Sequence, residues 1–212
     1  MPVLAVLNQK GGVGKTTIAT HIAMRLSELK HRVLLIDADQ QGSSLDWKAA
    51  RGEAPAFTVV GLPKDSIHRE IGELSKDYDW VVIDGPPRVS TVAKSAIAAS
   101  DMVLIPVQPS PYDVWAAKDI VDLIVEVRVL KEDLKAAFTV NRKVVGTAIG
   151  RDVSSALSNF PVAVLKSFIS QRVSFAESAA SGRTVLEVEP RGAGAKEVRD
   201  LVKEIMEHLD GR

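Results

Sequence analysis

A glycine-rich stretch near the N-terminus constrains this fold more than any other feature. The sequence NQKGGVGKTT covers residues 8–17 and lies between a short apolar run and a segment with helical periodicity. Glycine lets successive backbone N–H groups turn inward, and the N-terminus of the following helix adds partial positive charge. We therefore predict a strand, a phosphate-binding loop and a helix in this order. The anion would face the backbone of Gly11, Gly12, Val13 and Gly14.

The polar side chains of this loop have assignable chemistry. Lys15 is expected to bridge the β and γ phosphates of a nucleotide, Thr16 to bind Mg²⁺, and Thr17 to contact the α phosphate. The general phosphate-loop pattern begins with a glycine where this chain has Gln9. The observed form K-G-G-x-G-K-T is a variant of that loop, known as a deviant Walker A motif. Its extra lysine, Lys10, is a second positive charge that phosphate binding by Lys15 does not explain.

Short apolar runs alternate along the chain with longer segments of helical periodicity. Most runs are apolar at consecutive positions, as in strands of a parallel sheet that is covered on both faces. The runs are Val3–Leu7, Val33–Asp37, Phe57–Val60, Trp80–Asp84, Met102–Val107, Ala136–Asn141 and Val162–Leu165. The clearest helical segments are Thr16–Leu29, Tyr112–Leu130 and Glu197–Leu209. This alternation predicts an α/β fold of three layers, with a doubly wound, mostly parallel sheet flanked by helices, in a single domain over residues 1–212.

Acidic side chains follow two of the predicted strands. Asp84 ends an apolar run, and we expect it to contact Mg²⁺ through water. Asp37 and Asp39 are two residues apart, so in an extended chain both would face the phosphates, where a carboxylate can orient the attacking water. A single aspartate after a strand can instead cap a helix or form a turn. Three such residues behind a phosphate loop favour nucleotide chemistry.

The binding site for the base is less well defined by the sequence. Asn141 and Arg142 follow the sixth predicted strand, where the amide could read the edge of adenine. A turn-forming role for Asn141 is the alternative. The proline-bearing connection PVQPSPYD, residues 106–113, could wall the base or simply begin the helix at Tyr112.

Composition excludes several function classes. The chain has no cysteine, which removes disulfides, thiolate nucleophiles and thiolate metal sites. Lys plus Arg equals Asp plus Glu at 27 each, so DNA or an acidic membrane would have to be met by a local patch. The N-terminal apolar run has no basic segment before it, and no run approaches the ~20 residues of a membrane span. We expect a soluble cytosolic protein.

Five segments together resemble the ParA-type partition ATPases of the MinD/ParA superfamily. They are KGGVGKTT, VLLIDADQQGS, VVIDGPP, LIPVQPSPYD and VNR, and the size resembles small members without an N-terminal helix-turn-helix domain. The resemblance implies ATP or ADP with Mg²⁺, weak intrinsic hydrolysis and an ATP-dependent homodimer. Lys10 would cross to the phosphates of the partner's nucleotide and find its counter-charge only there. Asp39 would position the hydrolytic water, with Asp37 supporting it near the metal.

The resemblance also implies partners. ATP-bound dimers of this family bind DNA without sequence preference, which makes them nucleoid-associated, and a centromere-binding ParB-type adaptor stimulates hydrolysis. The candidate DNA contacts here are Arg172, Arg183, Arg191, Lys196 and Arg199. Ala193 stands where family members often carry a further arginine. A solvated surface of paired charges is the alternative for these residues.

Two other functions fit the same nucleotide motifs. A MinD-type membrane ATPase ends in a basic amphipathic helix. The last helical segment here, KEVRDLVKEIMEHLDGR, mixes both signs of charge, and its apolar stripe indicates core packing. Membrane binding is therefore not expected. A nucleotide-gated scaffold without turnover is the remaining alternative, although the set Lys15, Thr16, Asp39 and Asp84 favours an enzyme.

Overall fold

The computed structural model describes residues 1–144 and 149–211. Within them the chain forms one seven-stranded sheet with the order β3-β2-β4-β1-β5-β6-β7, and every neighbouring pair of strands is parallel. The strands are β1 Val3–Val6, β2 Val33–Asp37, β3 Thr58–Gly61, β4 Trp80–Asp84, β5 Met102–Val107, β6 Lys135–Lys143 and β7 Ala163–Ser170.

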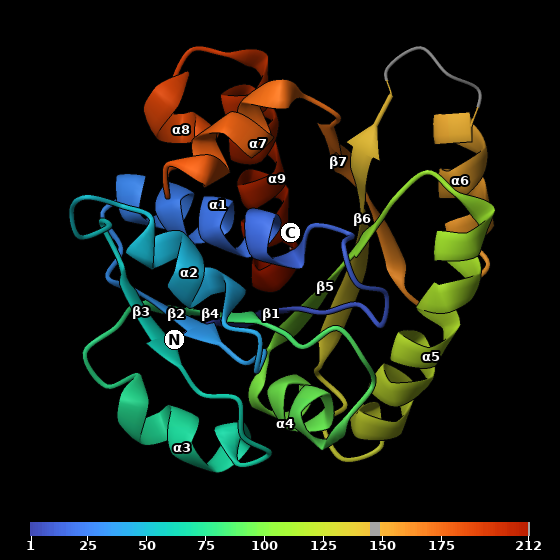
Figure 1. Cartoon of the computed structure of the whole chain (residues 1–212). Coiled ribbons are helices and arrows are strands. Elements are labelled where there is room, and N and C mark those ends of the chain that lie inside the picture. Colours follow the sequence, from blue (N-terminus) through green and yellow to red (C-terminus); the bar gives the residue numbers. More distant parts are fainter. Residues whose placement is uncertain (145–148, 212) are drawn as a thin grey trace.

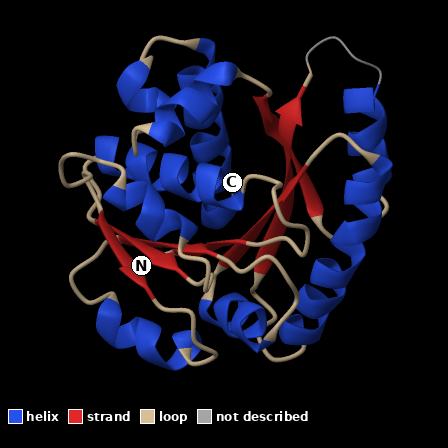
Figure 2. Cartoon of the chain, viewed as in Figure 1, coloured by secondary structure: helices blue, strands red, loops and turns tan. Residues whose placement is uncertain are grey.

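Helices cover both faces of the sheet, which confirms the predicted three-layer α/β fold (Figures 1 and 2). One face carries α1 Lys15–Glu28, α2 Ser43–Ala49, α7 Val173–Ala180, α8 Val185–Val188 and α9 Ala193–Asp210. The other carries α3 Ile67–Leu74, α4 Thr91–Ala99, α5 Pro111–Arg128 and α6 Ile149–Leu157. In the part of the chain that the structure describes, no helix combines the length and apolar character needed to cross a membrane.

The central strands are buried on both faces, as their continuous apolar sequences predict. All residues of β1, β2, β4 and β5 are buried. The edge strand β7 extends to Ser170, beyond the predicted end at Leu165. Its later positions include Lys166 and Ser167, which interrupt the apolar run, and their backbone N–H groups donate to the Glu204 carboxylate at 2.8 and 2.7 Å. An edge strand can carry such polar residues because a helix side chain, rather than another strand, satisfies its backbone.

The sheet topology brings the polar strand ends together. β1 continues into α1 on one face, whereas the neighbouring β4 is followed by α4 on the other face (Figure 1). Loops that leave adjacent strands toward opposite faces open a crevice at the carboxyl end of a parallel sheet. Asp37 and Asp84 are paired in register across β2 and β4 at this end. The crevice is therefore where the predicted acidic groups meet the glycine-rich loop.

The interior aromatic Phe138 provides a test of the packing. It is fully buried on β6, and its ring lies 5.7 Å from that of Phe160. We predict that Phe138→Ala lowers the free energy of unfolding by about 3–5 kcal/mol, because it removes a large apolar side chain and leaves a cavity. Urea denaturation measures this change. The control Tyr112→Ala, at a side chain that is 71% exposed, should change it by less than about 0.5 kcal/mol; equal losses would contradict the packing described.

Candidate nucleotide-binding site

Three side-chain hydrogen bonds join the glycine-rich loop to neighbouring segments. The Asn8 side-chain amide donates to the Pro106 carbonyl at 2.7 Å, and Gln108 donates to the Gly12 carbonyl at 3.0 Å. Asn141 donates to the Val13 carbonyl at 2.7 Å. Gly14 has φ 93°, and a Cβ there would lie 2.3 Å from the Asn141 amide nitrogen. The loop therefore requires glycine both for its backbone conformation and for the close approach of β6.

Lys15 is the first residue of α1, and its side chain is buried at the base of the loop. It is only 7% exposed, and its Nζ donates to the Lys10 carbonyl at 3.4 Å. Burial lowers the pKa of Lys15, while the nearby carboxylates of Asp84 and Asp39 oppose this shift. A desolvated ammonium among loop N–H groups is suited to bind the phosphates of a nucleotide.

Asp84 lies at the end of β4 and is 1% exposed. Its Oδ2 accepts a hydrogen bond from the Ser44 hydroxyl at 2.8 Å, and the Thr16 hydroxyl also bonds to the carboxylate. Its Oδ1 is buried and has no hydrogen-bond partner among the described residues. Burial raises the pKa of Asp84 to about 7, although the two hydroxyls and Lys15 partly oppose the shift.

This unsatisfied oxygen fits the expected metal. A buried carboxylate without a second partner gains stability from a nearby cation, and oxygen donors are those that Mg²⁺ prefers. Thr16 and Asp84 are the residues that would hold Mg²⁺ here, Asp84 through water. Ser44 was not predicted from the sequence. The only signal for it was Gly42-Ser43-Ser44, a pattern typical of a helix start.

The contacts of Asp37 match the alternative that an aspartate after a strand caps a helix or forms a turn. Its Oδ2 accepts the backbone N–H groups of Ser44 and Leu45 at 2.8 and 3.1 Å, and its Oδ1 accepts that of Asp39 at 3.1 Å. Burial raises the pKa of Asp37, and these three bonds lower it again. Both oxygens are thus engaged in fixing the first turn of α2 and the loop before it. A direct catalytic or metal role for Asp37 stays a prediction.

Asp39 lies closer to solvent than Asp37, on the same loop. Its Oδ1 accepts the Gln41 backbone N–H at 3.0 Å, and its charge acts on Lys15. The expected water-orienting role of Asp39 stays a prediction, and its half-buried position leaves an oxygen available for a water molecule.

Lys10 has a counter-charge within its own chain. Its Nζ lies 2.6 Å from Oδ2 of Asp113, in the first turn of α5. The Lys10 side chain is 42% exposed, whereas that of Asp113 is 1% exposed. The expectation that Lys10 finds a counter-charge only on a partner's nucleotide is therefore wrong for the isolated chain. Asp113 belongs to the PVQPSPYD segment, and no local sequence pattern pairs it with a residue 103 positions away.

A cavity of about 860 Å³ lies beside the loop and provides room for a base and sugar. Its walls come from the loop and from the carboxyl ends of β6 and β7 with the adjoining α7; they include Thr17, Asn141, Ile169, Phe175, Ala176 and Ala179. Apolar and aromatic walls suit the faces of a planar base. The contribution of β7 and α7 was missed, because nothing in their sequence distinguishes these small apolar residues from core.

The side chain of Asn141 is occupied by the backbone. Its amide donates to Val13, and its Oδ1 accepts the backbone N–H of Arg142 at 2.9 Å. Arg142 itself has φ 53°, a left-handed conformation at the end of β6. The geometry matches the turn-forming alternative, and contact of Asn141 or Arg142 with adenine stays a prediction.

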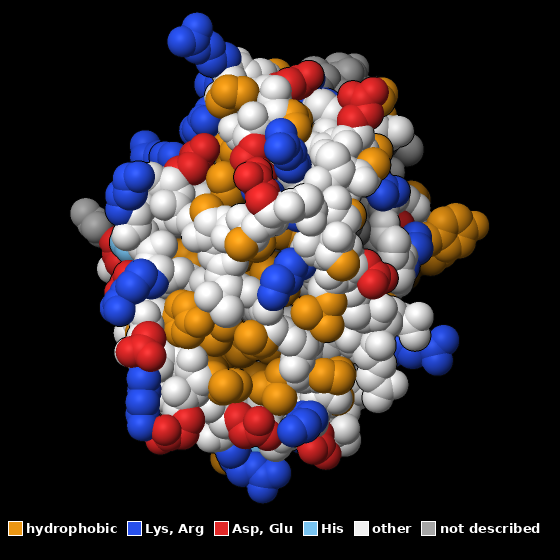
Figure 3. Space-filling model, turned by 60° about the vertical axis from the view of Figure 1, so that its left-hand side comes forward, with side chains coloured by type: hydrophobic (Ala, Val, Ile, Leu, Met, Phe, Trp, Pro, Cys, Tyr) orange, Lys and Arg blue, Asp and Glu red, His pale blue; other side chains and the backbone are white. Residues whose placement is uncertain are grey.

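The five candidate DNA contacts lie on or near the last three helices, and most are engaged. Arg172 pairs with Glu197 at 2.7 Å, Arg183 with Glu53 at 3.6 Å, and Lys196 with Asp200 at 3.1 Å. Arg199 donates to the Pro190 carbonyl at 2.7 Å. Arg191 is exposed and has no ion pair within residues 1–144 and 149–211. On the face shown in Figure 3, basic and acidic side chains lie interspersed and form no continuous basic surface.

A phosphate loop, a buried lysine, and a hydroxyl beside a metal-suited carboxylate define a P-loop nucleotide-binding protein. Comparison with known proteins identifies the family. Residues 4–185 match the model of the CobQ/CobB/MinD/ParA nucleotide binding domain, and the chain belongs to this family. The resemblance to the MinD/ParA superfamily is thereby confirmed.

Relatives match over nearly the full length of the chain. Maintenance of carboxysome distribution protein A of Halothiobacillus neapolitanus is 31% identical, covering 96% of this chain and 95% of that protein. Chromosome-partitioning ATPase Soj of Thermus thermophilus is 30% identical, covering 96% and 94%. In fold, the chain is similar to cobyrinic acid a,c-diamide synthase from Mycobacterium smegmatis with bound ATP analog and magnesium, with TM-score 0.80, 23% identity, and coverage of 100% and 97%.

The raised pKa of Asp84 predicts a pH-dependent instability of the metal-free protein. In the unfolded chain an aspartate titrates near pH 3.9, and in the folded chain Asp84 titrates near 7. The folded state therefore holds this proton more tightly, and stability falls as pH rises through that window. In urea denaturation without Mg²⁺, we predict that Asp84→Asn gains about 3 kcal/mol over the wild type between pH 5 and pH 8. A constant difference across this range would contradict the assignment.

Proposed function

We propose that this protein hydrolyses Mg·ATP and uses an ATP-dependent homodimer to position a cellular cargo. The observation that carries the proposal is the contrast between the two lysines of one loop. Lys15 is buried at the phosphate site, whereas Lys10 is partly exposed at its rim and held by Asp113. A lysine at the rim can serve a second nucleotide that approaches from outside.

The residues of the site divide the chemistry of hydrolysis among them. Phosphoryl transfer depends mainly on positioning and on stabilising charge. The loop N–H groups and Lys15 orient the phosphates, and Asp39 orients the attacking water. Thr16, together with Asp84 through water, would hold Mg²⁺, which would supply positive charge beside the phosphate oxygens. Asp37 and Ser44 keep Asp84 and the first turn of α2 in place.

Dimerisation would require Lys10 to leave Asp113. The Lys10 side chain is 42% exposed and can reach outward, where the several oxygens of a triphosphate would replace the single carboxylate of Asp113. The exchange leaves Asp113 buried without its cation, which favours the paired monomer when no triphosphate is opposite. This competition makes the dimer dependent on ATP.

The cargo follows from the relatives named above, whose names refer to chromosome partitioning and carboxysome distribution. We propose that the ATP dimer binds DNA without sequence preference, in the cytoplasm and on the nucleoid, and that a ParB-type adaptor stimulates hydrolysis. Support comes from the exposed Arg191 and Lys196, which a dimer doubles. The membrane alternative is disfavoured because the apolar stripe of α9 is packed in the core: Val198, Leu201, Val202 and Ile205 are each 1% exposed.

Retention assays distinguish the proposed functions. We predict that the protein with ATP and Mg²⁺ sediments with plain duplex DNA, that ADP abolishes retention, and that anionic liposomes retain nothing. Because phosphate contacts release counterions, retention should fall steeply as salt rises from 50 to 200 mM. Arg191→Ala should weaken retention, whereas Lys118→Ala, on the opposite face, should not. Retention on liposomes instead of DNA would favour the membrane function, and absence of ATP turnover with any stimulus would favour a scaffold.

Lys10 provides the matching test of the dimer. We predict that Lys10→Ala binds ATP with unchanged affinity but stays monomeric, because Lys15 and the loop still hold its own nucleotide. Analytical ultracentrifugation with ATP and Mg²⁺ measures the association. Lys118→Ala is the control, since this α5 lysine is 66% exposed and forms an ion pair with Asp122 on its own helix. A Lys10→Ala variant that dimerises like the wild type would overturn the proposed role.

A further inference from the structure

The short helix α2 is attached at both ends to functional parts of the molecule. At its N-terminus, the Ser44 hydroxyl donates to Asp84, and Asp37 accepts two N–H groups of the first turn. At its C-terminus, the Trp47 indole N–H donates to the Arg183 carbonyl at 3.2 Å. α2 therefore spans the distance between the metal-suited carboxylate and the turn that joins α7 to α8.

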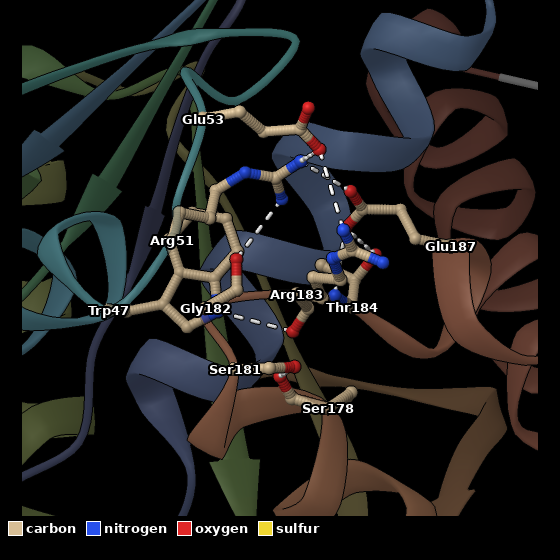
Figure 4. A network of polar contacts seen from close by, with 9 residues as sticks. All are labelled: Trp47, Arg51, Glu53, Ser178, Ser181, Gly182, Arg183, Thr184 and Glu187. Atoms are coloured by element: carbon tan, nitrogen blue, oxygen red, sulfur yellow. Dashed lines mark hydrogen bonds and ion pairs between the residues drawn. The ribbon is translucent and has the colours of Figure 1, made fainter.

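Arg51, just after α2, forms the centre of the second attachment (Figure 4). Its side chain is only 6% exposed, and its guanidinium lies 2.8 Å from Glu187 and donates to the Gly182 carbonyl at 3.1 Å. The guanidinium also lies 5.8 Å from the centre of the Trp47 ring. A planar fork that binds a carboxylate and a carbonyl at once fixes direction as well as distance.

The carboxylate that receives Arg51 is itself fixed. The other oxygen of Glu187 accepts the backbone N–H and the hydroxyl of Thr184, at 2.8 and 2.9 Å, in a capping box at the start of α8. Burial opposes ionisation of Glu187, but the bonds from Arg51 and Thr184 outweigh it and lower its pKa. Arg51 is thus held by a charged group that belongs to the backbone framework of α8.

The turn between α7 and α8 touches the backbone at the end of α2. Gly182 has φ 62°, and a Cβ there would lie 2.5 Å from the Trp47 carbonyl oxygen and 2.6 Å from the Arg51 nitrogen. Because no side chain fits between them, the turn packs directly against the backbone at the end of α2. A displacement of one is therefore transmitted to the other.

The same turn continues from α7, which forms a wall of the base cavity. Phe175, Ala176 and Ala179 of α7 line the cavity together with Thr17. His21 completes the frame: its Nδ1 contacts the Thr17 carbonyl at 2.6 Å, and its Nε2 accepts the Val185 N–H at 3.0 Å. Burial lowers the pKa of His21 to about 4, so the ring is neutral, with the proton on Nδ1.

From these contacts we infer that Arg51 is a positioning residue that couples the base cavity to the carboxylates of the metal site. Contact of the base with α7 would fix the position of the turn at Gly182. Through Arg51 and Trp47, the position of this turn would determine that of α2, and so that of Ser44 beside Asp84. This role rests on the proposed ATP hydrolysis and deepens it, because it makes the alignment of the phosphate chemistry depend on an occupied base cavity. Arg51 does not line the base cavity, and within the described residues it forms no hydrogen bond with Thr16 or Asp84.

Arg51→Lys tests this coupling, because it keeps the charge and removes the fork. We expect kcat for ATP to fall about tenfold, a typical coupling magnitude, while the Kd for ADP measured by calorimetry changes less than about twofold. The fluorescence of Trp47 supplies a second measurement. We expect ADP binding to change the emission of the wild type, the change to vanish in Trp47→Phe, and Arg51→Lys to lose most of it while still binding ADP.

Arg128→Lys is the matched control. Arg128 donates to the Leu134 and Pro161 carbonyls at the other end of the sheet, so its variant loses a comparable fork without touching the site. Its kcat should equal that of the wild type. If Arg51→Lys does not fold, Glu187→Gln, which removes the charge that holds Arg51, should give the same loss of kcat.

The outcomes separate the coupling from the proposed function. Equal kcat for Arg51→Lys and the wild type, or equal losses of kcat and affinity, would overturn the coupling while hydrolysis by the wild type stands. No hydrolysis by the wild type would overturn the proposed function. In that case the change in Trp47 fluorescence on ADP binding tests the coupling by itself. If Arg51→Lys keeps this change, the coupling is overturned; if Arg51→Lys loses it while still binding ADP, the coupling is supported.

Discussion

The burial of Asp84 beside Lys15 is the constraint on which the rest of the site depends. Asp84 is 1% exposed, and one of its oxygens has no partner in residues 1–144 and 149–211. Such a carboxylate is costly to ionise, and burial raises its pKa to about 7. Its position at the end of a central parallel strand, in register with Asp37, follows from the sheet order. The loop, the first turn of α2 and the base of α1 are arranged around this group. Ionisation of Asp84 is costly in this environment, and a bound Mg²⁺ would offset that cost.

The architecture could be predicted from the sequence because its central strands are apolar at consecutive positions. The predicted Val33–Asp37, Trp80–Asp84 and Met102–Val107 match the observed strands residue for residue. The predicted strand bounds are wrong at the edge of the sheet, where β7 has a neighbouring strand on one side only. The apolar run predicts a strand that ends at Leu165, whereas β7 continues through Lys166 and Ser167, because Glu204 of α9 satisfies their backbone. Short helices such as α2 and α8 are also not predicted from the sequence, because one or two turns are too short to show a helical period of apolar residues.

In the site, the sequence predicts the residues that belong to a local motif. It does not predict the residues whose roles depend on partners far away in the chain. Lys15, Thr16 and Asp84 lie together at the carboxyl end of the sheet. The contacts of Lys10 with Asp113, and of Asn141 with Val13, join positions more than a hundred residues apart, which a pattern of local spacing cannot contain. The same limit applies to Arg172 and Arg183, whose carboxylate partners Glu197 and Glu53 only the fold reveals. Arg51 is a further example: no sequence motif marks this arginine, and its proposed role depends on contacts of its guanidinium with Glu187 and Gly182.

The central claim is that Asp84 forms part of a Mg²⁺ site beside the phosphates. The proton that Asp84 releases when Mg·ATP binds tests this claim most directly. Isothermal titration calorimetry of Mg·ATP binding at pH 7, in buffers of different ionisation enthalpy, counts the protons exchanged. With a pKa of about 7, Asp84 is about half protonated at this pH and must ionise when it faces Mg²⁺. The account predicts release of about half a proton per site that disappears in Asp84→Asn. A binding enthalpy independent of the buffer, with the wild type and Asp84→Asn alike, would contradict it.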